Sequence, residues 1–546
     1  MTSSPTMTSD LSRGQNVPKL WPVLAVVAGF WGVLILWMGG IWTVLAEYSY
    51  GWVIPMLCTM LLWERWRTRP APTTCRHRRF GLTLVVLAAI GFSLWRLFLE
   101  ITPYWRFAMW AFGGSAVILT LATIYLLGGR SWLRHFAFPV IFFLLAIPWP
   151  ERFEWPLIGA LTQTNASITV ELLSFFHITS VKIGNLILIE PGLVGVEEAC
   201  SGIRSFQSTL MVGLFLGELF RFTFWRRFTL VILGAAVSFA FNILRTFFLV
   251  WSCTREGLGA VNKFHDPAGW TVLGASFTAL ALLSWWLHRS RKAPPSSRTT
   301  TTPIVLPNVP PLAVVSLGLL FVLGSWLVSE YWFRRHEVTR VPARSWSLAQ
   351  AGFPDSVAPS QIAPSVKTIL CYDHGAGWRW KDGAENSWQA FLFEWDASRS
   401  LHRRIAADVS ATRHQPEDCF AAAGMQLRHA YDQRQYLANG VPFNFKVYEF
   451  ADRGASLFVF SSLWESQVRP SAQAALDLGY RPSTGRAISD SIHKVVHGDR
   501  GITGLSRVFK FGVQGPRNVT DAEAAFQQQL NHLVQPQPAN LARTAR

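Results

Sequence analysis

Cysteine is scarce in this sequence. The 546 residues contain six Cys, and none of them stands in the closely spaced pairs that zinc clusters and disulfide frameworks use. Charge is scarce too, since Asp, Glu, Lys and Arg together make up 15% of the chain whereas apolar residues make up 50%. Because the apolar residues stand in long blocks, the composition excludes a single soluble domain and predicts a membrane protein.

Acidic residues are few relative to basic ones, and 33 Asp and Glu against 50 Lys and Arg leave a formal net charge of +17. Nucleic-acid binding is one interpretation of so basic a chain. The Lys and Arg residues, however, form short clusters between the apolar blocks, which is the pattern of cytoplasmic loops in membrane proteins. We therefore expect a lipid bilayer, and no nucleic acid, as a partner of this chain.

Nine apolar stretches are candidates for transmembrane helices, and we expect eight or nine helices to cross. The first starts at Trp21, and the others cover residues 51–63, 80–99, 107–127, 136–149, 206–220, 228–251, 268–287 and 312–328. No small-residue cleavage signature ends the first stretch, so it is predicted to be an uncleaved span and not a signal peptide. The second and fifth stretches are short for a hydrocarbon core of about 30 Å.

A mixed polar and apolar segment separates the fifth stretch from the sixth. Within residues 157–176 the apolar pattern is interrupted by Thr162, Gln163, Thr164 and Asn165. Two interpretations stay open, a span with a polar face and a helix that lies in the membrane interface. Residues 181–189, which are followed by Pro and Gly, favour a short strand and a turn.

The basic clusters predict an orientation. If all of them face the cytoplasm, and if residues 157–176 do not cross, the alternate connections lie outside without conflict. This topology puts Cys200, residues 252–266 and everything after Glu330 on the extracytoplasmic side. The clusters contain Arg65, Arg67, Arg69, Arg76, Arg78, Arg79, Arg130, Arg134, Arg221, Arg226, Arg227, Arg289, Arg291, Lys292 and Arg298.

The composition changes to that of a soluble domain after Glu330. Residues 387–395, 443–450 and 456–461 alternate as strands do, whereas residues 471–478 and 521–533 favour helices. The predicted fold is an α-helical polytopic membrane protein followed by a small extracytoplasmic α+β domain. Its expected segments are a disordered cytoplasmic start (1–20), a catalytic membrane domain (21–290), a Pro/Ser/Thr linker (291–311), a transmembrane tether (312–329) and the outer domain (330–546).

Cys200 lies where a polar connection gives way to an apolar run, within Val196-Glu-Glu-Ala-Cys-Ser-Gly-Ile-Arg204. If the run is a helix, Ser201 or Gly202 caps it, and the thiol meets the positive end of the helix dipole. Thiolates are favoured at such a place, so Cys200 is the candidate nucleophile. The other thiols of the membrane part, Cys58, Cys75 and Cys253, lack this context.

Arg245 and His265 are the candidate partners of the thiol. Arg245 lies within an apolar span, with Asn242 one turn earlier on the same face; the alternative is an arginine that only extends to the headgroups. A lone loop histidine such as His265 is usually just solvated. Because the predicted topology brings a thiol, a base and a cation to one membrane face, we interpret Cys200 as nucleophile, His265 as proton carrier and Arg245 as oxyanion donor.

Three motifs carry a resemblance to a known family. Glu198-Ala-Cys-Ser-Gly202, Asn242-Ile-Leu-Arg245 and His265-Asp-Pro-Ala-Gly269-Trp270 follow in this order, each at the start or end of a span. They resemble the signature motifs of the exosortases, which the related archaeosortases share. The resemblance covers roughly residues 21–287. It implies a membrane-embedded cysteine transpeptidase, and its catalytic cysteine, arginine and histidine fall on the same three residues.

The resemblance also implies a reaction and a location. Clients would be exported proteins with a C-terminal tripartite sorting signal of the Pro-Glu-Pro type, cleaved through a thioester and transferred to a cell-surface acceptor of open identity. The enzyme would lie in the bacterial inner membrane and would need no metal and no cofactor. Supporting roles are expected for Glu198, Ser201, Gly202, Arg204, Asn242 and Gly269.

A further motif lies in the outer domain. The run His414-Gln-Pro-Glu-Asp-Cys-Phe-Ala-Ala-Ala-Gly424 resembles the His-x-Pro-x-x-Cys pattern of the exosortase-associated C-terminal domain, onto which His414, Pro416 and Cys419 fall. A second thiol site and a structural role both stay open. A disulfide between Cys371 and Cys419 is a further expectation if the compartment is oxidising.

Several alternatives stay open. Glu197 and Glu198 either tune the thiol, bind the basic end of a signal or are solvated turn carboxylates. Arg204 either helps the oxyanion or the substrate, or anchors the chain at the interface. A peptidase that only hydrolyses its client is one rival function. The other is a polysaccharide or lipid transporter, for which Arg245 matters and Cys200 does not.

Overall fold

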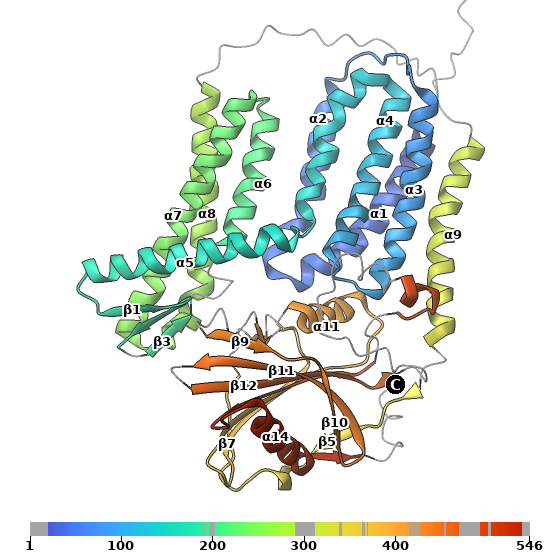
Figure 1. The fold of residues 1–546 in the computed structure, drawn as a ribbon. Helices are drawn as coiled ribbons and strands as arrows, with labels where there is room; N and C mark the ends of the chain where they lie inside the picture. Colours follow the sequence, from blue (N-terminus) through green and yellow to red (C-terminus); the bar gives the residue numbers. More distant parts are fainter. Residues whose placement is uncertain are drawn as a thin grey trace, which may run out of the picture.

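The N-terminal part of the protein is a bundle of upright helices, and the C-terminal part is built around one large sheet (Figure 1). The computed structural model describes residues 20–190, 192–195, 202–289, 312–337, 341–362, 366–367, 370–413, 416–417, 420, 425–452, 455–468, 492–500 and 504–537. Residues 341–537 are called the C-terminal region below. The end of the helices that faces this region in Figure 1 is called the lower end.

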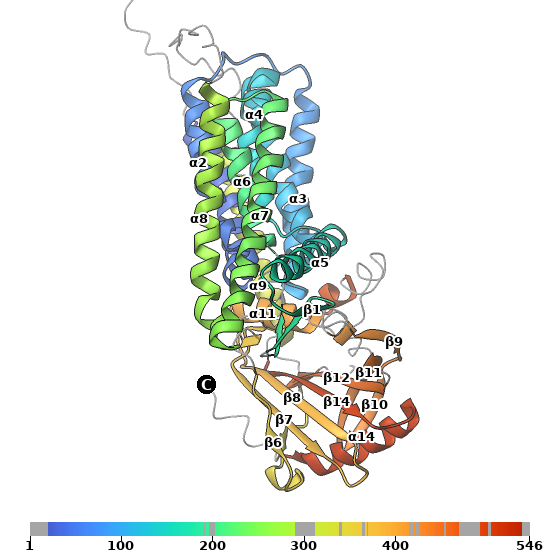
Figure 2. The same cartoon turned by 90° about the vertical axis from the view of Figure 1, so that its left-hand side faces the viewer.

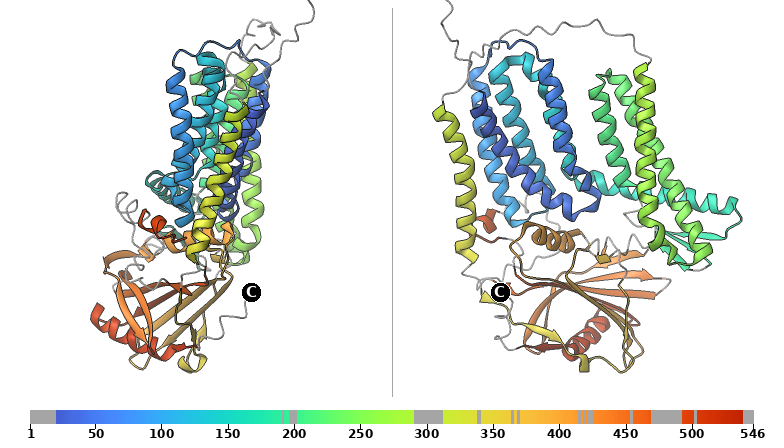
Figure 3. Two further views of the ribbon diagram at one scale, coloured as in Figure 1. Left: turned by 90° about the vertical axis from the view of Figure 1, so that its right-hand side faces the viewer. Right: turned by 180° about the vertical axis from the view of Figure 1, so that it is seen from behind.

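Six helices are long and apolar enough to cross a membrane, and the views in Figures 2 and 3 show them as one upright bundle. They are α1 (Trp21–Val44), α3 (Arg78–Ile101), α4 (Arg106–Phe142), α7 (Phe224–Glu256), α8 (Ala260–Arg289) and α9 (Leu312–Glu337). Two shorter helices of 14 and 17 residues, α2 (Ile54–Arg67) and α6 (Ile203–Leu219), run alongside. The expected number of eight or nine crossings therefore stays a prediction.

Helix α4 reverses its direction at a glycine. Gly129 has a φ of 67° and a ψ of −161°, and a Cβ atom at this position would collide with Thr73. The chain turns back there. This is seen in a hydrogen bond of 2.8 Å, which the indole N–H of Trp110, near the start of α4, donates to the carbonyl of Pro148. The predicted spans 107–127 and 136–149 are thus the two arms of one kinked helix, which ends in the 3-10 helix η2 (Phe143–Ala146).

Helix α5 (Glu151–Phe175) lies across the lower end of the bundle and is not among the six candidate spans (Figure 1). Its fully buried Glu154 fixes it there, because Arg106 pairs with this carboxylate and Tyr48 of the 3-10 helix η1 (Ala46–Trp52) donates to it. Of the two interpretations of this segment, the arrangement agrees with an interface helix.

A small antiparallel sheet follows α5. It contains β1 (Ser180–Ile183), β2 (Leu186–Ile189) and β3 (Gly192–Gly195). The predicted single strand over residues 181–189 was wrong, because Gly184, with a φ of 60°, allows a tight turn that divides the run into a hairpin. The hairpin packs its buried isoleucines against α5 and α7.

The C-terminal region is built on an antiparallel sheet of eight strands in the order β10-β11-β12-β14-β8-β7-β6, with β9 paired to β11. Its apolar face carries Phe445, Phe460 and Phe511, against which Phe526 of α14 packs. The elements are β4 (Val341–Pro342), β5 (Trp346–Leu348), η4 (Gln350–Gly352), β6 (Ala358–Pro359), β7 (His374–Lys381), β8 (Ser387–Trp395), α11 (Leu401–Arg413), β9 (Gln426–Ala430), β10 (Arg434–Ala438), β11 (Val441–Asp452), β12 (Ala455–Glu465), β13 (Gln467–Val468), β14 (Ser506–Gln514), α14 (Val519–Leu533) and β15 (Val534–Pro536).

The alternating patterns located these strands well. The predicted strand 387–395 coincides with β8, strands 443–450 and 456–461 lie within β11 and β12, and helix 521–533 lies within α14. The predicted helix 471–478, the linker 291–311 and residues 1–19 of the predicted disordered start lie outside the described residues.

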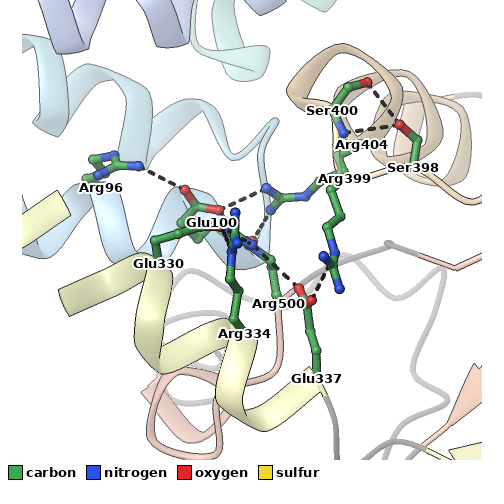
Figure 4. A network of polar contacts seen from close by, with 10 residues as sticks. All are labelled: Arg96, Glu100, Glu330, Arg334, Glu337, Ser398, Arg399, Ser400, Arg404 and Arg500. Carbon is green, nitrogen blue, oxygen red and sulfur yellow. Dashed lines mark hydrogen bonds and ion pairs between the residues drawn. The ribbon is translucent and has the colours of Figure 1, made fainter. Parts of the chain in front are cut away.

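The C-terminal region is held to the bundle by a buried ion-pair network around Glu100, at the end of α3 (Figure 4). Arg404 of α11 and Arg500 donate to the Glu100 carboxylate at 2.8 and 3.0 Å, and Arg96 does so at 3.1 Å from the preceding turn. Arg500 also pairs with Glu330 of α9. We call this set, with Arg334, Glu337 and Arg399, the docking network.

Helix α11 completes the docking by packing against the lower end of α1 and the turn between α3 and α4. Asp408 accepts a hydrogen bond from the backbone N–H of Tyr104 at 2.8 Å. Gly40 of α1 leaves room for Ile405 and Leu401, since a Cβ atom there would lie 2.7 Å from the Ile405 side chain. Charge and close packing thus fix the C-terminal region to one part of the bundle.

Candidate active site

Arg245 of α7 and His265 of α8 are in direct contact. The Nη2 atom of Arg245 lies 3.1 Å from Nε2 of His265, and it also donates to the backbone carbonyl of His265 at 3.2 Å. The two residues that the sequence assigned to a cation and a base therefore meet near the lower end of the bundle. Their sequence separation is 20 residues, so the helix pair α7–α8 creates the contact.

His265 lies inside a helix, which corrects the predicted connection 252–266 and the predicted span start at residue 268. Helix α7 continues to Glu256, and α8 begins at Ala260. The physical reason is Gly257, whose φ of 83° ends α7 abruptly and lets the next helix begin after three residues. His265 is consequently held on a rigid element and not on a loop.

The hydrogen bonds of His265 indicate its tautomer. Its Nδ1 atom lies 3.0 Å from Oδ1 of Asp266, which accepts a hydrogen bond, and its Nε2 atom faces the donating guanidinium of Arg245. A neutral imidazole with its proton on Nδ1 satisfies both contacts. The Asp266 side chain is 87% exposed, so this carboxylate orients the ring from the solvent side.

Two glycines make the close approaches between the motifs possible. Gly202 has a φ of 82° as the N-cap of α6, and a Cβ atom there would lie 2.7 Å from Nδ2 of the buried Asn242. A Cβ atom at Gly269 would lie 3.4 Å from Nη2 of Arg245. The first motif therefore touches the second at Gly202, and the second touches the third at Gly269 and His265.

The structure describes only part of the first motif, residues 198–202. Glu198, Cys200 and Ser201, together with Glu197, lie outside the described residues. Helix α6 begins at Ile203 with Gly202 as its cap, which is one of the two predicted caps. The Arg204 side chain is exposed, donates to Oγ of Ser49 at 3.2 Å and lies over the ring of Trp270 at 5.9 Å.

Helix α5 contributes residues that sequence reasoning did not assign to the site. Asn165 donates to Oγ1 of Thr246 at 2.8 Å, Thr246 donates to the carbonyl of Asn242 at 3.1 Å, and Thr169 donates to Asn165 at 3.3 Å. All four side chains are buried. The signal was the polar interruption of the apolar pattern at residues 162–165. Of these four residues Thr162 and Asn165 are buried, and Asn165 contacts α7, whereas Gln163 and Thr164 are exposed.

The motif of the C-terminal region stays a prediction, because His414 and Cys419 lie outside the described residues. Pro416 is described and buried. The Cys371 thiol donates to the carbonyl of Val44 at 3.9 Å, and its burial raises its pKa. A raised pKa lowers the fraction of thiolate, which disfavours Cys371 as a nucleophile.

Comparison with known proteins gives one match. Residues 42–286, somewhat less than half of the chain, match the family model described as transmembrane exosortase (Exosortase_EpsH). The matched segment runs from α1 to α8 and contains the three motifs, and it ends before α9 and the C-terminal region. Searches of curated proteins and of solved structures found no match. The match supports a transpeptidase-type function and, with the six apolar helices, a multi-pass membrane protein.

Proposed function

We propose that this protein is a membrane cysteine protease and transpeptidase of the exosortase type, with Cys200 as nucleophile and with Arg245 and His265 as its catalytic partners. The observation that carries the proposal is the contact between Arg245 and His265, in a site where Gly202 packs against Asn242. Cys200 stands two residues before Gly202 in the sequence. The family match over residues 42–286 supports the same assignment.

The first half of the reaction forms a thioester. The Cys200 sulfur attacks the carbonyl carbon of the scissile peptide bond, its proton passes to Nε2 of His265, and Arg245 stabilises the resulting oxyanion. Collapse of this intermediate breaks the C–N bond, and the imidazolium returns its proton to the leaving amine. The client is then an acyl group on sulfur, and its C-terminal fragment leaves with the new amino terminus.

The second half transfers the acyl group. An amine or hydroxyl of the acceptor attacks the thioester carbonyl, gives its proton to His265, and releases the Cys200 thiolate, which is a good leaving group. The sulfur regains its proton from the imidazolium. This sequence needs neither a metal nor an oxidant, since the thiol proton leaves with the amine and the proton of the acceptor restores the thiol.

The observed geometry adds one requirement to this reaction. Nε2 of His265 is the atom that should receive the thiol proton, and it now faces the guanidinium of Arg245 at 3.1 Å. Arg245 must therefore turn from the imidazole to the developing oxyanion as the proton arrives. The turn is favourable because an imidazolium repels the guanidinium, whereas an oxyanion attracts it.

The proposal extends to substrate and location. Clients are exported proteins that end in a Pro-Glu-Pro type motif, an apolar run and a basic tail, and the acceptor lies at the cell surface. The enzyme spans the bacterial inner membrane, with its site and C-terminal region on the extracytoplasmic face, and the C-terminal region corresponds to the exosortase-associated domain. The positions of the basic clusters, which all fall on one side in the predicted topology, support this orientation.

The test is co-expression with a tagged client that carries such a signal. Wild-type enzyme is expected to shorten the client, whereas Cys200→Ala and Cys200→Ser variants leave it intact. Processing by either variant would sink the proposal. Mass spectrometry of the new C-terminus then separates transfer from hydrolysis, because an adduct indicates transfer and a free carboxylate indicates a peptidase that only hydrolyses.

A further inference from the structure

Gln207 of α6 is a buried amide without a hydrogen-bond partner. Its side chain is 2% exposed, and neither Nε2 nor Oε1 has a partner among the residues that the structure describes. Buried polar groups in proteins nearly always pair, because leaving one unpaired costs its full desolvation. An amide with both ends unmet can therefore receive a ligand that supplies both a donor and an acceptor.

The face of α6 that carries Gln207 is turned to the N-terminal helices. Arg204, Gln207, Met211 and Phe215 follow at spacings of three and four residues and share one face. Met211 and Phe215 pack into the core formed with α1 to α4, and Arg204 donates to Ser49 of η1. Gln207 thus lies between the apolar core and the exposed arginine, in the seam between two parts of the bundle.

Arg204 lies at the mouth of this seam. One of its Nη atoms donates to Ser49, and its guanidinium lies over the exposed ring of Trp270. Among the described residues no carboxylate pairs with Arg204. A guanidinium that is positioned by a hydroxyl and an indole keeps further N–H groups for a ligand, and its planar fork matches a carboxylate.

We infer that Arg204 and Gln207 form a subsite that binds an extended, carboxylate-bearing peptide segment of the client, an inference that rests on the proposed function. The amide of Gln207 complements a peptide group, which also offers one N–H and one C=O. The guanidinium of Arg204 pairs with the acidic side chain, and the N-terminal end of α6 adds a positive field.

The position of the subsite in the chain connects it to the proposed reaction. Arg204 and Gln207 follow Cys200 by four and seven residues, and Trp270 follows Gly269, which packs against Arg245. A peptide bound along this face of α6 is held next to the catalytic residues by the same helix start that carries the nucleophile. Binding energy from the signal is then available to orient the scissile bond.

The experiment measures equilibrium binding to the full chain in nanodiscs, in a Cys200→Ala background that does not turn over. The probe is a fluorescent peptide with a Pro-Glu-Pro motif, an apolar run of about twenty residues and a basic tail. Gln207→Met, which has a similar volume and no polar amide, is expected to raise the Kd about tenfold. Arg204→Gln is expected to raise the Kd about tenfold for this peptide and to leave binding of a Pro-Gln-Pro peptide unchanged.

Thr209→Val is the matched control. Thr209 is also buried on α6 with an unpartnered hydroxyl among the described residues, but it faces α7 at Gly234. Both Gln207→Met and Thr209→Val remove a buried polar group without a partner, so neither should lower the unfolding temperature. Only Gln207→Met should weaken binding of the peptide probe, and this difference separates a binding role from a structural one.

Four outcomes decide the inference. An unchanged Kd for Gln207→Met overturns it and assigns the amide to buried water. If Arg204→Gln weakens binding of the Pro-Glu-Pro and Pro-Gln-Pro peptides equally, the inference is also overturned, because Arg204 is then an interface anchor. No binding by the parent chain overturns it as well. Binding by the parent with the expected losses sustains the subsite, and if wild type does not cleave that peptide, the proposed function fails separately.

Discussion

The arginines of the docking network and Arg245 of the candidate site differ in their described contacts. In the docking network, Arg404 and Arg500 are 4–5% exposed in their side chains and are matched by the carboxylates of Glu100 and Glu330. In the candidate site, the described contacts of Arg245 join it to the imidazole and the backbone carbonyl of His265. The carboxylates fix their arginines by charge, whereas the contact with His265 places the Arg245 guanidinium beside a group that can carry a proton.

The difference separates an interface from a site. Buried pairs of opposite charge hold two parts of a protein in one arrangement, and breaking one partner leaves an uncompensated charge. A cation held beside a base can instead respond to charge that develops on a substrate. The following predictions test this contrast, from the largest expected effect to the smallest.

Glu100→Gln is expected to cost about 3–5 kcal/mol of stability, because Arg404 and Arg500 are then buried without their shared carboxylate. Thermal unfolding and protease digestion of the C-terminal region measure the loss. Glu64→Gln is the control, since Glu64 is 44% exposed and lies 3.9 Å from Arg221, and a surface pair of this kind contributes about 0–1 kcal/mol. Equal unfolding temperatures for both variants would contradict the docking role.

Arg245→Lys is expected to lower client processing about 100- to 1,000-fold and to leave the unfolding temperature nearly unchanged. An ammonium keeps the charge but loses the planar fork, whose N–H groups contact His265 before the reaction and the oxyanion during it. Initial rates of processing measure the effect. Arg255→Lys, in the last turn of the same helix over Trp251, should process at the wild-type rate. A wild-type rate for Arg245→Lys would remove this residue from the mechanism.

Asp408 makes the docking interface sensitive to pH. Burial raises the pKa of Asp408 to about 6, so the folded chain holds this proton more tightly than the unfolded chain, whose value is about 4. The contribution of Asp408 to stability is therefore complete below about pH 4 and is lost as the pH rises through about 6, by on the order of 2–3 kcal/mol. Asp408→Asn should lack this part of the pH dependence, as measured by unfolding from pH 4 to 8.

Asparagine at position 408 keeps an oxygen for the backbone N–H of Tyr104, so the hydrogen bond itself is not the variable. Other carboxylates titrate in the same range, and the difference between the two pH curves isolates Asp408. Parallel curves for wild type and variant would show that this carboxyl is ionised at no cost.

Gly202→Ala is expected to cost about 1–2 kcal/mol, because its backbone is left-handed, and to slow processing, because a Cβ atom collides with Asn242. Gly274→Ala is the matched control, since no atom lies within 4 Å of a Cβ atom at that position of α8 and alanine favours a helix. Unfolding temperature and processing rate are measured together. An active, stable Gly202→Ala variant would contradict the close packing of the first two motifs.

The contact of Arg245 with His265 could be predicted from the sequence because both residues lie near the ends of consecutive apolar runs. Strand β8 could be predicted because a sheet with one buried face imposes alternation. The docking network could not, since Arg404 and Arg500 lie 304 and 400 residues from Glu100 and no local pattern connects them. The helix around His265 was missed because the predicted span began with the apolar run at residue 268, whereas α8 begins at Ala260, directly after the turn at Gly257.

The sequence separations in the docking network also determine the order in which its contacts can form during synthesis. During synthesis Glu100 leaves the ribosome long before Arg404 and Arg500, which follow it by 304 and 400 residues in the sequence. In that interval its carboxylate has Arg96, one turn earlier in the same helix, as a provisional partner at 3.1 Å. Arg404 and Arg500 reach Glu100 only when the C-terminal region folds. The buried charge at the lower end of the bundle is therefore fully paired only after the last part of the chain has been made.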